Sequence, residues 1–85
     1  MSSSLPDVDA RAKEVAVSDD ELSVLLADGR RISVPLAWFP RLLRATPSQR
    51  ARFELIGDGH GIHWPDIDED LSVAGLLRGS PSVSR

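Results

Sequence analysis

The sequence contains no cysteine and no tyrosine, and its aromatic residues are limited to two tryptophans and two phenylalanines. The absence of cysteine excludes disulfides, thiolate metal sites and cysteine nucleophiles. Apolar runs are only a few residues long, so we expect no segment that spans a membrane. The first residues also lack the basic start and apolar stretch of a secretion signal, and we expect a cytoplasmic protein.

The length of 85 residues allows one small domain. Apolar residues make up 41% of the chain and charged residues 27%, a balance that predicts a soluble domain with one modest core. Both ends of the chain are polar and rich in serine and proline. We therefore expect flexible tails at residues 1–10 and 80–85, on either side of a single domain at residues 11–79.

Alternating apolar residues in the first half of the chain predict three strands. The alternation covers residues 12–18, 22–27 and 30–34. Asp28 and Gly29 separate the second strand from the third, and Asp-Gly between alternating segments is typical of a hairpin. We expect a type I′ turn there, in which both central residues have positive φ.

Helix-capping residues and a second hairpin follow. Thr46 and Gln49 have the spacing of a capping box, so a helix should begin at Pro47. Ser72 and Gly79 are suited to begin and end the last helix. The expected helices span 40–45, 47–51 and 73–78, and the expected hairpin pairs 53–56 with 62–64. The pattern predicts an α+β fold, with a small antiparallel sheet from two hairpin regions plus an N-terminal strand, and two or three short helices.

Charge is strongly segregated along the chain. Residues 1–28 hold seven acids and two basic residues (2 − 7 = −5), residues 29–53 hold six arginines and no acid (+6), and residues 54–70 hold six acids and no Lys or Arg (−6). Such blocks predict either a polarised surface or mutual neutralisation within the fold, and both interpretations stay open. For the first interpretation, the candidate partner-binding residues are Asp66, Asp68, Glu69 and Asp70, with Trp38 as an apolar anchor.

The basic block at residues 30–52 suggests an alternative role in nucleic-acid binding. Its candidate phosphate contacts are Arg41, Arg44, Arg50 and Arg52. The overall net charge of −3, the flanking acidic blocks and the lack of tyrosine weigh against this alternative. If it holds, affinity for DNA or RNA should fall steeply with added salt.

Two segments resemble ligand-binding loops without completing them. Segment 57–61 has glycines at every second position, but strand-like residues follow it and no Gly-Lys-Ser/Thr is present, so a hairpin turn is favoured over a phosphate loop. Segment 66–70 matches the first three ligand positions of a calcium loop. However, Leu71 and Leu77 occupy the places of its required glycine and glutamate. We predict neither a phosphate nor a calcium site.

The two histidines are weak candidates for chemistry. His60 and His63 lack the spacing of a zinc-protease motif, and we predict no metal and no cofactor. Acid–base catalysis by His63 with Asp66 stays open as a less favoured alternative. No serine lies in a nucleophile-elbow sequence, so we predict no catalytic residue and no enzymatic activity.

Several short motifs occur together in one order over residues 11–79. They are LADGR at 26–30, PLAWFPRL at 35–42, ATPSQR at 45–50, GIHWP at 61–65 and DEDLSV at 68–73. In this order the sequence resembles the bacterial family called domain of unknown function 2442. The resemblance implies a small α+β domain with antiparallel strands, and it implies no active site, because the family has none established.

The resemblance also implies a partner. Relatives often occur beside another small uncharacterised protein, which suggests a toxin–antitoxin pair. We therefore expect a protein–protein interaction module, the antitoxin-like partner of a small basic protein encoded nearby. The nucleic-acid regulator and the acid–base enzyme are the alternatives, and exposed strand edges in so small a sheet also allow a homodimer.

Overall fold

A computed structural model describes residues 11–79, and both expected tails, 1–10 and 80–85, lie outside the described residues. The strands are β1 (Ala12–Val17), β2 (Glu21–Leu26), β3 (Arg31–Pro35), β4 (Glu54–Ile56), β5 (Gly61–Trp64) and β6 (Glu69–Ser72). The helices are α1 (Pro40–Arg44), α2 (Pro47–Ala51) and α3 (Val73–Arg78), with 3₁₀ turns η2 (Leu36–Trp38) and η3 (Gly57–Gly59). The predicted α+β class is confirmed. Within residues 11–79, no helix is long and apolar enough to cross a membrane.

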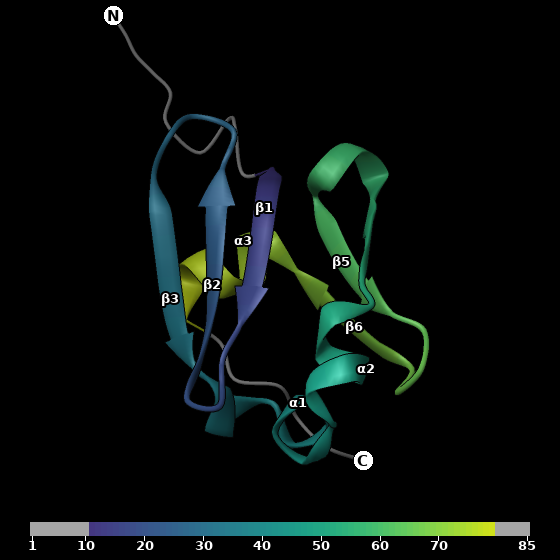
Figure 1. The fold of residues 1–85 in the computed structure, drawn as a ribbon. Coiled ribbons are helices and arrows are strands. Elements are labelled where there is room, and N and C mark those ends of the chain that lie inside the picture. The colour runs from purple at the N-terminus through teal and green to yellow at the C-terminus, as the bar shows by residue number, and fades with distance from the viewer. Residues whose placement is uncertain (1–10, 80–85) are drawn as a thin grey trace, which may run out of the picture.

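The strands form two antiparallel sheets of three strands each, ordered β1-β2-β3 and β4-β5-β6. Figure 1 shows the two sheets side by side, with α1 and α2 together near their lower end and α3 behind the first sheet. The sequence analysis had not assigned β6 as a strand. Its residues alternate between buried and exposed, and Leu71 lies opposite Ile62 of β5. This long-range pairing completes the second sheet.

The first hairpin is present, but the predicted turn type is wrong. The Leu26 N–H donates to the Arg30 carbonyl (2.7 Å) and the Gly29 N–H donates to the Leu26 carbonyl (3.0 Å), which closes a loop of three residues, 27–29. Only Gly29 in this loop has positive φ, at +96°. Asp28 instead accepts the Arg30 N–H with its carboxylate (3.0 Å). This geometry suits a type I turn followed by a glycine bulge, the usual three-residue hairpin loop.

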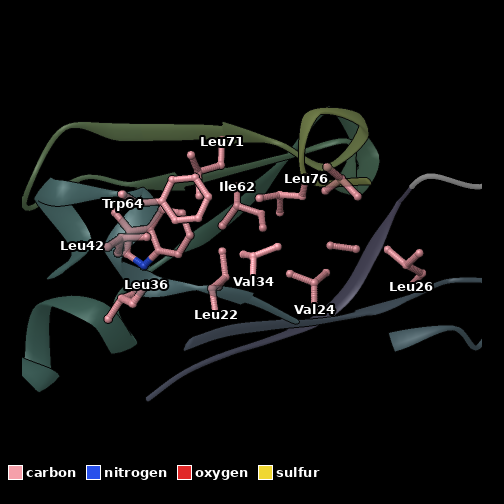
Figure 2. Packing of buried hydrophobic residues seen from close by; sticks show 13 residues of the cluster. Leu22, Val24, Leu26, Val34, Leu36, Leu42, Ile62, Trp64, Leu71 and Leu76 are labelled. Carbon is pink, nitrogen blue, oxygen red and sulfur yellow. The ribbon is translucent and has the colours of Figure 1, made fainter. Parts of the chain in front are cut away.

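The hydrophobic core lies between the two sheets (Figure 2). Leu22, Val24 and Leu26 are fully buried on one face of β2, as their alternation predicts. They face Ile62 and Trp64, which β5 contributes from the opposite sheet. The other buried apolar residues of this cluster are Ala12, Val34, Leu36, Phe39, Leu42, Leu71, Val73 and Leu76. Both sheets therefore depend on one shared core.

Local capping signals were predicted correctly. The Thr46 hydroxyl accepts the Gln49 N–H (3.1 Å), and the Gln49 side-chain oxygen accepts the Thr46 N–H (2.9 Å), so both halves of the capping box are formed. Ser72 caps α3 by accepting the Gly75 N–H (3.2 Å), and Gly79 ends that helix in the left-handed conformation. These caps fix where the chain leaves each sheet.

The second hairpin also contacts the first sheet directly. Gly59, at its tip, has φ of +94°, and a Cβ added there would lie 2.7 Å from the Ala12 carbonyl oxygen. Only glycine allows this close approach of the two backbones. The contact holds η3 against the beginning of β1, so the second hairpin and the first sheet meet at this end of the molecule.

Candidate functional site

Arg50 is buried, with 8% of its surface exposed, and is not available for the phosphate contacts that the sequence analysis considered. Its guanidinium donates to the carbonyls of Leu42 and Leu43 (2.9 Å each) and to the carboxylate of Asp19 (2.8 Å). The first two bonds satisfy carbonyls at the end of α1, and the third reaches the turn before β2. Arg50 therefore has a structural role, which corrects its place among the candidate binding residues.

The other arginines of the candidate set are exposed, and two of them contact the acidic segment. Arg41 donates to the backbone carbonyl of Asp68. The Arg52 Nε lies 3.6 Å from an Asp66 carboxylate oxygen, a loose surface pair. Arg44 is exposed on α1. The basic and acidic blocks that are separate in sequence thus meet in part within the fold.

The acidic candidates do not share one surface. Asp66, Asp68 and Asp70 are exposed, but Glu69 is buried, with 7% of its surface exposed. Glu69 lies opposite Trp64 in the register of β5 and β6. Burial raises the pKa of Glu69 above its ordinary value, and the charge of Arg41 opposes this shift. The expectation that Glu69 belongs to an exposed docking surface is therefore corrected, because strand alternation turns it inward.

The two tryptophans differ in exposure. Trp64 is fully buried, as predicted, and its indole N–H donates to the Arg50 carbonyl (3.0 Å). Trp38, the candidate anchor, is half-buried and packs against the core. Its ring lies edge-on to that of Phe39, with ring centroids 6.4 Å apart. Trp38 therefore presents only part of its ring to solvent.

His63 is placed with Asp70 rather than with Asp66. The imidazole Nδ1–H donates to the Asp70 carboxylate across β5 and β6, whereas Asp66 faces Arg52. Glu54 lies opposite His63 on its other side, so the outer face of the second sheet carries a row that we call the outer row: Glu54, His63 and Asp70. The hydrogen bond to Asp70 raises the pKa of His63 above its ordinary value of 6.5, and the charges of Asp70, Glu54 and Asp68 add to this effect.

The outer row has no counterpart in the sequence analysis, because it depends on the register of three strands. Within residues 11–79, no group of three or more histidine, aspartate or glutamate side chains is arranged to hold a metal ion. His60 lies apart from the row, with its ring Nδ1 2.7 Å from the Gly57 carbonyl oxygen. The row therefore offers a charged surface pattern and no ligand set.

Strand β4 is an exposed edge of the second sheet. All three of its residues, Glu54, Leu55 and Ile56, are exposed, and we call them the β4 edge. Leu55 and Ile56 expose 39% and 43% of their surface, which is unusual for large apolar residues on a strand of a small domain. Ile56 lies over Gly61, where an added Cβ would come within 2.9 Å of Ile56 Cγ1. The β4 edge thus combines apolar side chains with a free strand border.

A family comparison covers nearly the whole fold. The profile of a family described as "Protein of unknown function (DUF2442)" matches residues 12–82. The chain belongs to the DUF2442 family. This confirms the family resemblance found in the sequence, and no curated protein matches the chain.

Two solved structures share the fold of this DUF2442 domain. A protein of unknown function from Rhodospirillum rubrum is 30% identical, with a TM-score of 0.73, and the match covers 87% of this chain and 92% of that one. An uncharacterized protein from Chromobacterium violaceum is 24% identical, with a TM-score of 0.72, and the match covers 87% of this chain and 70% of that one. Both similarities support the fold.

The pairing of His63 with Asp70 predicts a pH-dependent contribution to the stability of this DUF2442 domain. Because the folded-state pKa of His63 is raised, the contribution is fully present below the unfolded-state pKa of about 6.5 and is lost as the pH rises through the folded-state pKa. We expect Asp70→Asn to lower the urea midpoint more at about pH 5.5 than at about pH 8.5.

Glu14→Gln is the matched control for this measurement, because Glu14 is an exposed acid on β1, in the other sheet. Its effect on the urea midpoint should not depend on pH in the same way. Equal effects of Asp70→Asn at the two pH values would contradict the pairing.

Proposed function

We propose that this DUF2442 domain is a protein–protein interaction module that binds its partner through the outer side of the second sheet. The observation that carries the proposal is the β4 edge, where Leu55 and Ile56 are exposed on a strand with a free border. Strand edges of this kind are sites of pairing with another chain unless they are covered or charged. Binding a partner would cover this apolar surface.

The charges around this surface favour a basic partner. Four exposed carboxylates belong to the second sheet and its connecting turn, and they are Glu54, Asp66, Asp68 and Asp70. Only Asp66 and Asp70 face a side chain of opposite or ionisable charge, Arg52 and His63 respectively. Complementary charge speeds encounter and selects among partners. The family resemblance fits this role, with a small basic protein encoded nearby as the partner and this chain as its antitoxin-like counterpart.

The proposal is tested by quantitative affinity capture with the tagged full-length chain in its native cells. We expect the wild type to enrich one partner, Ile56→Glu on the β4 edge to lose it, and Leu43→Glu to retain it. Leu43 is the matched control, because it is an apolar residue on α1 with a similar exposed fraction of 45%. Unfolding curves confirm that both variants fold.

Two results would remove the proposal. One is a wild-type chain that enriches no protein above the untagged background. The other is salt-sensitive retardation of DNA or RNA by the wild type without protein capture, which would favour the nucleic-acid alternative through Arg41, Arg44 and Arg52.

A further inference from the structure

We infer that the β4 edge accepts an antiparallel strand whose sequence is apolar, apolar, basic. The inference rests on the proposed function and deepens it by naming the chemistry of the bound segment. Strand addition extends the hydrogen-bonded ladder of a sheet, so each side chain of β4 acquires one directly opposite neighbour on the new strand. The neighbours that these positions favour follow from the existing cross-strand register.

The basic residue is specified by the outer row. In this row Glu54 lies opposite His63, and His63 lies opposite Asp70. The Asp70 carboxylate already accepts the imidazole N–H, whereas no side chain within residues 11–79 forms a hydrogen bond or ion pair with the carboxylate of Glu54. The position opposite Glu54 on an added strand continues the row beyond the edge. A lysine or arginine there would complete the alternation of charge across the sheet.

The two apolar residues are specified by Ile56 and Leu55. Ile56 is on the same outer face as Glu54 and covers Gly61, so the residue opposite it on an added strand would pack against an apolar side chain. Leu55 is on the opposite face, in line with Ile62 and Leu71 of the core. An apolar residue opposite Leu55 would extend the core row outward and cover the exposed part of Leu55.

The direction of the new strand sets the order of these residues. A strand antiparallel to β4 meets Ile56 first, then Leu55 and then Glu54. Its sequence from N to C is therefore apolar, apolar and basic. A register shift of one residue would place the basic residue opposite Leu55 on the core face, which opposes slippage.

A second copy of this chain is a poor occupant of the same edge. Pairing β4 with β4 antiparallel about Leu55 would place Glu54 of each copy opposite Ile56 of the other. Neither Glu54 would then gain a cation, and each Ile56 would face a carboxylate. Charge complementarity thus favours a partner strand over a homodimer at this edge.

The inference is tested with a synthetic peptide, acetyl-Ser-Thr-Val-Ile-Lys-Thr-Ser-amide, titrated into the isotope-labelled full-length chain and followed by NMR. The control peptide has glutamate in place of lysine. We expect the lysine peptide to shift the amide resonances of residues 54–56 and to bind about fivefold more tightly than the control peptide, the effect of one cross-strand charge pair.

Charge reversal in the protein provides the matched comparison. Glu54→Lys should reverse the peptide preference, whereas Glu14→Lys, which makes the same change of charge on β1 in the other sheet, should leave it unchanged. Equal binding of the two peptides, resonance shifts centred on β1 or β3, or self-association of the wild type through β4 would each overturn the inference.

The outcomes also separate this inference from the proposed function. If the wild type captures a partner in cells but the lysine peptide does not shift the resonances of β4, the strand-addition inference fails and the interaction module stands. If the peptide binds as expected but no cellular partner is captured, the proposed function fails while the binding chemistry of the β4 edge is supported.

Discussion

Replacing Trp64 with alanine is expected to lower the free energy of unfolding by about 4 kcal/mol, the usual cost of removing a large aromatic ring from a core. Trp64 is fully buried between the two sheets, and its indole N–H donates to the Arg50 carbonyl. Small domains have total stabilities of about 5–15 kcal/mol, so this variant should be partly unfolded at ambient temperature. Urea unfolding followed by circular dichroism measures the change.

Trp64→Phe separates packing from hydrogen bonding at the same position. It keeps an aromatic ring and removes the N–H, so we expect a loss of about 1–3 kcal/mol from the unsatisfied Arg50 carbonyl and the smaller ring. A Trp64→Ala variant with wild-type stability would show that the two sheets do not share a core through this residue.

Replacing Arg50 with alanine is expected to lower the free energy of unfolding by about 3 kcal/mol, because two carbonyls of α1 lose a charged donor. The carbonyls are those of Leu42 and Leu43, and the Asp19 carboxylate loses its partner as well. Arg50→Lys should recover only part of the loss, because one ammonium group lacks the planar fork of donors that reaches all three acceptors.

Arg44→Ala is the control for the Arg50 variants, because Arg44 is an exposed arginine of the same block. Its effect should stay within about 0.5 kcal/mol. Equal urea midpoints for Arg50→Ala and Arg44→Ala would contradict the structural role of Arg50 and return it to the candidate phosphate contacts.

The parts of the fold that depend on neighbouring residues could be predicted from the sequence. The capping box of Thr46 and Gln49 involves residues three apart, and the alternation of Leu22, Val24 and Leu26 reports one strand face directly. The Asp28-Gly29 pair located its hairpin correctly. The turn type differed because the Asp28 carboxylate binds the Arg30 N–H, a choice that the dipeptide alone does not encode.

The parts that depend on distant residues could not be predicted in the same way. Strand β6 was hidden by its acidic residues, which suggested a docking surface or a helix cap, and only pairing with β5 turns Glu69 inward. Arg50 belongs to a basic block in sequence, but its acceptors include Asp19, 31 residues away. Charge counted along the chain therefore gave the correct composition of the surface and the wrong availability of these two residues.

The candidate site shows the same limit. Glu54, His63 and Asp70 are aligned only because two separate strand pairings share β5. The sequence analysis considered His63 with Asp66, three residues away, because spacing along the chain was the only guide. A side chain's cross-strand neighbours depend on register, which short-range patterns constrain weakly.

The most direct test of this account is amide hydrogen exchange of the full-length chain, measured with and without its captured native partner. Strand addition predicts that binding slows exchange at residues 54–56, while exchange in β1 and β3 stays as it is in the free chain. Protection confined to β1 or β3, with unchanged exchange at residues 54–56, would contradict the assignment of the β4 edge as the binding surface.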